Sequence, residues 1–344
     1  MGPHPAVAAV RSAVRGCLGE FTGDDLVLAA CSGGADSLAL AAALAHEAPR
    51  SGLRGGGVTV DHGLQPGSAD RAREVTALLS GLGLAPVASL RAVVAPGAGH
   101  GGPEAAARAG RYAAFGEALR QTGATAVLLA HSRDDQAESV LLGLARGSGA
   151  RSLAGMPASR GPYRRPLLQV SRATLRAACE ALGLRPWDDP HNGDPAYARA
   201  RVRHAALPAL EAALGPGITE ALARSARQLR ADAEVLDDLA AREAGLVRDP
   251  DGAWPATRLA ALPAALRTRV LRLAAIAAGC PPGALAERHI EALDRLVTSW
   301  RGQRGTDLPG GVRGTRRCGK LLFTAGHHRE PAGLSTSEGP VGRQ

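Results

Sequence analysis

A short apolar run, followed at once by a Ser/Gly-rich turn and a helical stretch, constrains this chain more than any other feature. Residues 26–30 read Leu-Val-Leu-Ala-Ala, and after Cys31 the turn reads Ser-Gly-Gly-Ala-Asp-Ser over 32–37. An evenly apolar run of this length is typical of a parallel strand that is buried on both faces. The order strand, glycine turn, helix predicts an anion cradle, because the first N–H groups of a helix lack partners within the helix.

The residue types in this turn suit a phosphate. Glycines let the backbone approach an anion because no β-carbon stands in the way, and the serine hydroxyls add donors. Asp36 differs, because a carboxylate repels phosphates unless a cation lies between them, so we interpret it either as a Mg²⁺ partner or as a helix cap. The predicted nucleotide-binding residues are Ser32, Gly33, Gly34, Ala35, Asp36 and Ser37.

Two commoner phosphate loops do not match the sequence. A Walker A loop needs a lysine directly after its last glycine, and Lys320 is the only lysine in the chain. A dinucleotide fingerprint needs three spaced glycines, and Gly81 and Gly83 are not followed by a third. The turn instead resembles the pyrophosphate loop, or PP-loop, of the N-type ATP pyrophosphatases. Those enzymes split ATP between the α and β phosphates and adenylate a carbonyl-type oxygen.

The first half of the chain alternates between strand-like and helix-like segments. Strands are expected at 26–30, 57–61, 86–94 and 125–130, and helices at 68–82, 103–122 and 134–145. This alternation predicts an α/β fold, a doubly wound parallel sheet whose site lies at the carboxyl ends of its strands. Asp61 ends a predicted strand, and Ser32 and His131 each follow one closely, so we expect all three near that edge of the sheet.

The second half has a different pattern. A Gly/Ser/Arg-rich linker is expected at 147–160 and a helix at 166–182, and the pattern from 207 to about 300 is helical and alanine-rich. Pro309-Gly310-Gly311 lies between short β-like runs and predicts a hairpin. We therefore expect an ATP-binding catalytic domain at 1–205, a smaller and mainly helical domain at 206–326, and a disordered tail at 327–344.

Composition narrows the class of partner. The chain has 41 Lys+Arg against 32 Asp+Glu, a net charge of +9, and nearly all of the positive charge is arginine, which favours a polyanionic partner. No two of the five cysteines are spaced as Cys-x-x-Cys, so neither a zinc nor an iron–sulfur site is indicated, and scattered cysteines suggest a reducing cytoplasm. No apolar run approaches 18 residues, which argues against a membrane span.

A second polar cluster follows the strand expected at 125–130. His131 precedes Asp134 and Asp135, and Glu138 lies one helical turn beyond Asp134, on the same face. Acidic residues at a helix start are favoured by the helix dipole, which is one interpretation of the cluster. Acid–base chemistry at the mouth of a parallel sheet, with carboxylates that bind a cationic amine and ATP–Mg²⁺, is the other.

Two longer segments narrow the resemblance. One runs from His131 to Met156 and reads His-x-x-Asp-Asp-Gln-x-Glu-Ser, then Arg-Gly-Ser-Gly, then Leu-Ala-Gly-Met. The other runs from Trp187 to Arg203 and includes Trp-Asp-Asp-Pro-His-Asn-x-Asp and Tyr-x-Arg-x-Arg-Val-Arg. With the Ser/Gly turn and Asp-His-Gly-Leu at 61–64, they resemble the tRNA(Ile)-lysidine synthetases over residues 20–210. Departures from the usual pattern lie beside these residues, at Ser139, His191 and Ala200.

The resemblance implies a reaction. This family adenylates O2 of the wobble cytidine, position 34, in the CAU anticodon of tRNA(Ile). The ε-amine of free lysine then attacks C2, and AMP leaves. The implied cofactors are ATP and Mg²⁺, and the implied partners are this tRNA and free L-lysine, with no membrane; a homodimer is left open.

The resemblance also implies roles for single residues. Arg111 would stabilise the charge that develops on the α-phosphate, and Asp36 would reach the pyrophosphate through Mg²⁺. His131 and Asp135 would position the cytidine or relay protons, while Asp135 or Glu138 would bind the lysine ammonium and accept its proton. The candidate contacts to the anticodon stem are Arg165, Arg199, Arg201 and Arg203, and Trp187 is expected in the core.

Three other functions fit part of the sequence. A tRNA thiolase of the same loop superfamily would need cysteine pairs or an iron–sulfur centre. An amidating ligase for small molecules would leave the net positive charge unexplained. A non-catalytic tRNA-binding protein would not need the intact Ser32–Ser37 hexapeptide.

Overall fold

The computed structural model describes residues 2–61, 63, 67–92, 102–147, 149–189 and 193–325. Contacts divide the chain into two units, Met1–Arg230 and Ala231–Gln344, which are described separately below. The domain boundary expected from the sequence lies at residue 205. The boundary between the two units lies further along the chain, inside one long helix, α10 (Ile218–Val247). The tail at 327–344 lies outside the described residues, as do residues 190–192.

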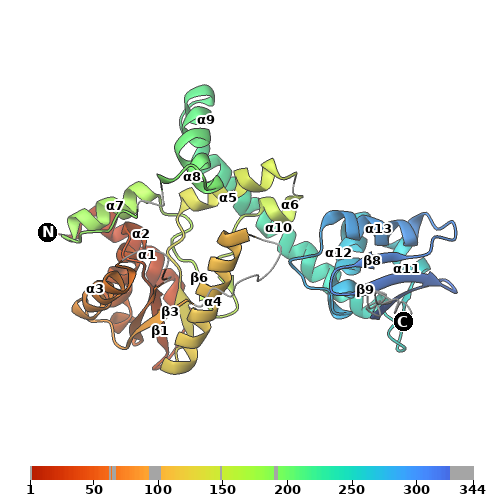
Figure 1. Cartoon of the computed structure of the whole chain (residues 1–344), viewed down its shortest axis with the longest axis horizontal. Coiled ribbons are helices and arrows are strands. Elements are labelled where there is room, and N and C mark those ends of the chain that lie inside the picture. Colours follow the sequence, from red (N-terminus) through yellow and green to blue (C-terminus); the bar gives the residue numbers. More distant parts are fainter. Residues whose placement is uncertain are drawn as a thin grey trace, which may run out of the picture. The chain divides into compact units, whose positions relative to one another are not determined.

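The first unit is built on a six-stranded sheet of order β3-β2-β1-β4-β6-β5 (Figure 1). Its strands are β1 (Leu26–Ala30), β2 (Arg54–Asp61), β3 (Val87–Arg91), β4 (Ala126–Leu128), β5 (Ser159–Arg160) and β6 (Tyr163–Arg164). All neighbours pair in parallel except β5, which runs antiparallel to β6. The predicted doubly wound parallel sheet is confirmed, and so are the four strands expected from the sequence.

Helices pack on both faces of this sheet because strand β1 is apolar on both. Val27 and Ala29 belong to a core formed with α1 (Pro5–Leu18), α2 (Ala35–Glu47) and α7 (Arg172–Ala181). Leu26 and Leu28 belong to a second core, formed with Phe115 of α4 (Gly102–Thr122). Helix α3 (Ser68–Gly81) contacts β2 and β3. The strand that precedes the Ser/Gly turn is therefore held from both sides.

Strand β2 begins three residues earlier than the sequence suggests. Its first part is Arg54-Gly-Gly-Gly57, and glycines are poor strand formers. The glycines are needed because the neighbours are close: a β-carbon at Gly56 would lie 2.6 Å from Leu28 Cδ2. The close contact between β2 and β1 thus outweighs the low strand propensity of glycine.

The expectations for 147–182 were wrong in two places. The linker expected at 147–160 contains a short helix, α6 (Ala150–Leu153), and strand β5. The helix expected from residue 166 begins only at Arg172, because the Ser171 side chain caps it by accepting a hydrogen bond from the Thr174 N–H. The remaining helices of this unit are α5 (Arg133–Ala145), α8 (Ala198–Arg201), a π-helical turn (Val202–Ala206) and α9 (Leu207–Leu214).

The second unit contains the end of α10, three further helices and an antiparallel sheet. The helices are α11 (Ala256–Ala261), α12 (Ala264–Ala277) and α13 (Glu287–Thr298). The sheet has the order β7-β10-β9-β8, with β7 (Trp254–Pro255), β8 (Thr306–Leu308), β9 (Val312–Arg317) and β10 (Lys320–Ala325). The hairpin expected around Pro309-Gly310-Gly311 joins β8 to β9. Within the described ranges, no helix is long and apolar enough to cross a membrane.

Candidate active site at the carboxyl edge of the parallel sheet

The Ser/Gly turn joins the end of β1 to the start of α2, as predicted. Helix α2 begins at Ala35, with Gly34 as its cap residue. The Ser37 hydroxyl accepts a hydrogen bond from the Ser32 N–H (3.2 Å) and donates one to the Gly34 carbonyl oxygen (2.9 Å). Because Ser37 is buried and bonded within the turn, its side chain holds the shape of the turn.

Gly33 is the residue at which the turn needs a glycine. Its φ is +87°, and a β-carbon there would lie 3.0 Å from Val75 Cγ2 of α3. The Gly33 carbonyl accepts a hydrogen bond from the Trp187 N–H at 2.9 Å. Trp187, expected in the core, is half-buried, and the Arg71 guanidinium lies over its ring. The turn is thus supported by a second segment from 150 residues further along the chain.

Asp36 lies in the first turn of α2, next to these backbone groups. Its Oδ1 atom is buried and has no hydrogen-bond partner among the described residues, and its Oδ2 lies 3.7 Å from Arg172 Nε. Burial raises the pKa of Asp36 to about 6, against the opposing effect of Arg172. A buried carboxylate oxygen without a donor fits a hard cation, and Mg²⁺ is commonly bound by one or two carboxylates together with substrate phosphates.

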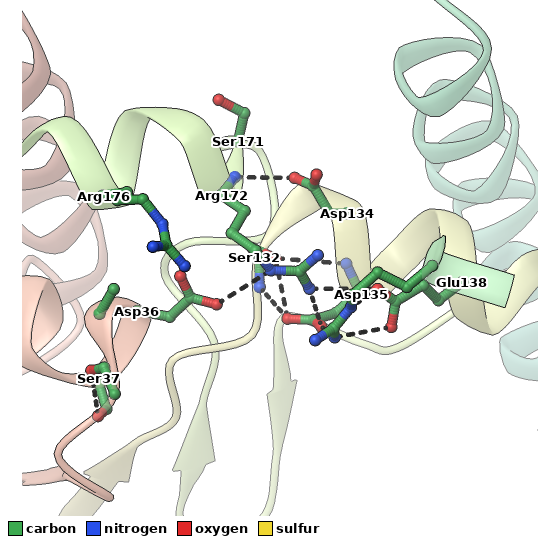
Figure 2. A network of polar contacts seen from close by, with 12 residues as sticks. Asp36, Ser37, Ser132, Asp134, Asp135, Glu138, Ser171, Arg172 and Arg176 are labelled. Atoms are coloured by element: carbon green, nitrogen blue, oxygen red, sulfur yellow. Dashed lines mark hydrogen bonds and ion pairs between the residues drawn. The ribbon is translucent and has the colours of Figure 1, made fainter. Parts of the chain in front are cut away.

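The acidic cluster at the start of α5 serves both as a helix cap and as part of the site (Figure 2). Asp135 Oδ2 accepts hydrogen bonds from the Ser132 N–H (2.7 Å) and hydroxyl (2.9 Å), which forms a capping box. Asp135 Oδ1 points the other way and accepts from Arg172 Nη2 at 2.8 Å. Glu138 follows one turn later with its side chain 1% exposed. The capping interpretation is therefore confirmed, and the acid–base role stays a prediction.

Arg172 is the residue that sequence reasoning missed. Its Nη2 also donates to Glu138 Oε1 at 3.2 Å, and its backbone N–H donates to Asp134 Oδ2 at 2.8 Å. Burial alone would lower the pKa of Arg172, but Asp135, Glu138 and Asp36 raise it overall. A signal was present in the sequence: a cation in the first helical turn is opposed by the helix dipole, which indicates an acidic partner elsewhere.

Two arginines that were expected at the anticodon stem are engaged inside the protein. Arg203, in the π-helical turn, donates from Nε to Glu138 Oε1 (2.7 Å) and from Nη2 to Glu138 Oε2 (3.2 Å). Arg165 is 4% exposed and donates to the Pro157 carbonyl and to the Tyr112 hydroxyl, both at 3.0 Å. The burial of Arg165 contradicts the expectation for that residue, whereas contact of Arg203 with the anticodon stem stays a prediction, because its side chain is 25% exposed.

Arg201 is exposed and donates hydrogen bonds to the Pro195 and Ala196 carbonyl oxygens at 2.7 and 2.9 Å, so its contact with the anticodon stem stays a prediction.

Three further predicted residues, Arg111, Arg199 and His131, lie in a cationic region. Arg111 of α4 and Arg199 of α8 make no hydrogen bond or ion pair with the residues that the structure describes. Desolvation and the nearby Arg108 lower the pKa of Arg111, and Arg199 contributes to the same effect. His131 lies in the field of Arg108 and Arg199 as well, and its Nδ1 is buried without a described partner. The site therefore has a carboxylate side and a guanidinium side.

The ionisation of His131 gives a first testable expectation. Burial lowers its pKa to about 4, despite the opposing effect of Asp135, so the imidazole is neutral at pH 7. The unfolded chain takes up this proton near pH 6.5 and the folded chain only near pH 4, so folded-state stability falls as the pH drops through this window.

We expect the free energy of unfolding of the wild-type chain, measured relative to a His131→Asn variant, to fall by about 2 kcal/mol between pH 7 and pH 5. Urea unfolding of both proteins at the two pH values measures these free energies. If the difference between wild type and variant is the same at pH 7 and pH 5, the imidazole is not buried in its neutral form.

The comparisons with known proteins identify the family of the chain. Residues 9–210 match the PP-loop domain family, and residues 255–321 match the TilS substrate binding domain family. A tRNA(Ile)-lysidine synthase of Thermobifida fusca is 58% identical over 94% of this chain and 99% of that protein. Another, of Streptomyces coelicolor, is 54% identical over 95% and 100%.

A solved structure shares the fold. The U34-tRNA thiolase NcsA from Methanococcus maripaludis, described with its [4Fe-4S] cluster, superposes with a TM-score of 0.53 over 65% of this chain and 80% of that chain. At 18% identity this likeness shows the fold alone. From the near full-length matches at more than half identity, the chain belongs to the tRNA(Ile)-lysidine synthase family.

Proposed function

We propose that this chain ligates free lysine to C2 of the wobble cytidine, position 34, of tRNA(Ile) with a CAU anticodon. ATP is the co-substrate, as in the PP-loop family that the chain matches, and AMP and pyrophosphate are the products. One observation carries the proposal: within a member of this family, Asp36 of the phosphate turn lies against the Asp135–Glu138 carboxylates through Arg172. These contacts support one site in which the turn binds ATP and the acids bind the amine.

The first step is adenylation of cytidine O2. The backbone N–H groups at the start of α2 would hold the departing pyrophosphate. Asp36 would hold Mg²⁺, which when bound supplies positive charge between this carboxylate and the phosphates. Arg111 pairs with no acidic residue among those that the structure describes, and it would stabilise the charge on the α-phosphate. His131, held neutral by burial, would orient the base through the imidazole.

The second step is attack by the lysine ε-amine on C2. A bond forms between that nitrogen and C2, the bond from C2 to the adenylated oxygen breaks, and AMP leaves with the oxygen. The amine has a pKa of about 10.4 in water and must lose a proton first. On its carboxylate side the site brings four carboxylates together with two guanidiniums, those of Arg172 and Arg203, which leaves net negative charge on that side for the ammonium. We propose Asp135 and Glu138 as the groups that attract it and accept its proton.

An arginine-rich concavity in the second unit supports binding of the tRNA backbone. It has a volume of about 530 Å³ and is lined by Gln303, Arg304, Arg313, Thr315, Arg316, Arg317, Leu322 and Thr324. Asp307 pairs with Arg313 at 2.7 Å, whereas the side chains of Arg304 and Arg317 have no partner among the described residues. Unpaired arginines on a concave sheet face suit phosphate contacts.

Reversing two of these charges, in an Arg304→Glu, Arg317→Glu double variant, is expected to raise KM for the tRNA by about tenfold or more, because phosphate contacts supply salt-dependent affinity. The dependence of KM on salt concentration should weaken, while KM for ATP and lysine should not change. Arg242→Glu with Arg288→Glu makes the same change of charge outside the concavity and serves as the control. Equal effects of the two double variants would mean that net charge alone attracts the tRNA.

A product assay tests the proposed function. The purified chain is incubated with ATP labelled at the α-phosphate, lysine, and an unmodified transcript of tRNA(Ile) with a CAU anticodon. We expect AMP and lysidine, identified by mass spectrometry of the digested tRNA, only when all three substrates are present. AMP formation that does not depend on lysine, or incorporation of sulfur into the tRNA, would overturn the proposal.

The setting we propose for this reaction is the cytoplasm, with the tRNA and free lysine as partners. A homodimer stays a prediction. All five cysteines are free thiols, which fits a reducing compartment.

A further inference from the structure

Arg172 is placed where three carboxylates from two helices converge (Figure 2). Its guanidinium donates to Asp135 Oδ1 at 2.8 Å and to Glu138 Oε1 at 3.2 Å, both on α5. On its other side, Nε lies 3.7 Å from Asp36 Oδ2, at the start of α2. The side chain is 21% exposed. One planar group thus connects the phosphate turn with the acids proposed to bind lysine.

Apart from the guanidinium of Arg172, two backbone N–H groups connect the start of α7 with the start of α5. The Arg133 N–H donates to the Val170 carbonyl at 2.9 Å, and the Arg172 N–H donates to Asp134 Oδ2 at 2.8 Å. These bonds connect the starts of the two helices whatever side chain residue 172 carries. The guanidinium, by contrast, stands in the first turn of α7, where the helix dipole disfavours a cation.

We propose that Arg172 is a positioning residue that holds the ATP-binding turn and the lysine-binding acids in one fixed arrangement. This inference rests on the proposed function. It names a residue that keeps the groups for adenylation and the groups for lysine attack in the same relative position. Its charge separates Asp36 from Asp135 and lowers the repulsion that an incoming triphosphate meets. Its planar fork contacts carboxylates on two helices at once, which the single ammonium of a lysine cannot do in the same way.

Two substitutions separate the effect of the charge of Arg172 from the effect of its planar shape. In Arg172→Gln the positive charge is lost, so KM for ATP should rise by about tenfold while KM for lysine stays unchanged or falls, because more negative charge faces the ammonium. At saturating substrates kcat should fall by about 10–100-fold, because Asp36 is no longer held relative to Asp135. In Arg172→Lys we expect KM for ATP within about threefold of wild type, with kcat still lowered by about tenfold.

Arg15→Gln is the matched control. Arg15 holds another deeply buried carboxylate, Glu47, at 2.7 and 3.0 Å, at the opposite end of α2 from the phosphate turn. Arg15→Gln should lower the free energy of unfolding, but it should not raise KM for ATP relative to KM for lysine. Thermal unfolding of each variant, and the folded fraction from circular dichroism, accompany the kinetics, so that a loss of folded protein is not mistaken for a loss of activity.

The outcomes distinguish this inference from the proposed function. A wild-type chain that forms no lysidine contradicts the proposed function itself. A wild-type chain that forms lysidine, with kinetic constants of Arg172→Gln within about twofold of it, overturns the inference alone. Arg172→Gln and Arg15→Gln could instead lose stability and activity to the same extent, with KM for ATP not raised relative to KM for lysine. That result would make Arg172 a structural residue and also overturn the inference. If Arg172→Gln does not fold, the Arg172→Lys kinetics decide: kcat at the wild-type value rejects the positioning role.

Discussion

An Asp36→Asn variant is expected to lower kcat/KM for ATP by about 10²–10³-fold, the size of effect seen when one group that stabilises transition-state charge is removed. Asparagine keeps the shape of the side chain and removes its charge. Oδ1 of Asp36 is buried without a hydrogen-bond donor among the described residues, so the substitution breaks no hydrogen bond at that oxygen. At Oδ2 it weakens one ion pair, the 3.7 Å contact with Arg172 Nε. Release of labelled AMP measures the rate, and filter binding of the tRNA should stay within about twofold of wild type.

Asp70→Asn provides the matched control for this substitution. Asp70 also lies in the first turn of a helix of the same unit, α3, but it is exposed and pairs with Arg73 of the same helix. A surface pair of this kind contributes little, so we expect the kinetic constants of Asp70→Asn to match those of the wild type. Turnover by Asp36→Asn equal to that of Asp70→Asn would remove Asp36 from the reaction.

A Glu138→Ala variant is expected to lose both stability and use of lysine. Glu138 is 1% exposed, and its two oxygens accept three hydrogen bonds, from Arg172 and Arg203. Removing it leaves Asp135 as the remaining carboxylate acceptor for both guanidiniums. We expect a loss of about 2–3 kcal/mol in the free energy of unfolding, less than the ~3–5 kcal/mol for a fully buried pair, because both arginines keep some contact with water.

The loss of lysine use would follow from the same change. With Glu138 absent, the two guanidiniums face the amine site with one carboxylate fewer, so KM for lysine should rise by about tenfold or more. Urea unfolding and lysine titration of the rate measure the two effects. Glu117→Ala is the control, since Glu117 is 41% exposed and pairs within α4 with Arg120. Equal losses of stability in the two variants would contradict the central place of Glu138 in the network.

Local features were predictable from the sequence because local chemistry determines them. The apolar run of β1, the Ser/Gly turn and the start of α2 were placed correctly, since strand period, glycine conformation and the onset of helix propensity all act within about a dozen residues. The acids at the start of α5 were also found, because a Ser132–Asp135 capping box is a short-range pattern.

Contacts between distant segments were beyond the same reasoning. Arg172 meets Asp36 and Glu138 from far along the chain, and only the packing of α7 on α2 and α5 brings them together. Arg165 and Arg203 were interpreted as contacts to the anticodon stem from the family resemblance, whereas the tertiary structure gives each of them an acceptor within the protein. The glycine run at the start of β2 was judged by propensity, whereas contact with β1 decides it.

The most direct test of the central claim is a crystal structure with α,β-methylene ATP, an analogue that cannot be split between its α and β phosphates. We expect the β and γ phosphates to accept hydrogen bonds from the backbone N–H groups of residues 33–37, with the α-phosphate on the side of Arg111. A triphosphate bound elsewhere in the chain, with the Ser32–Ser37 turn unoccupied, would contradict the account.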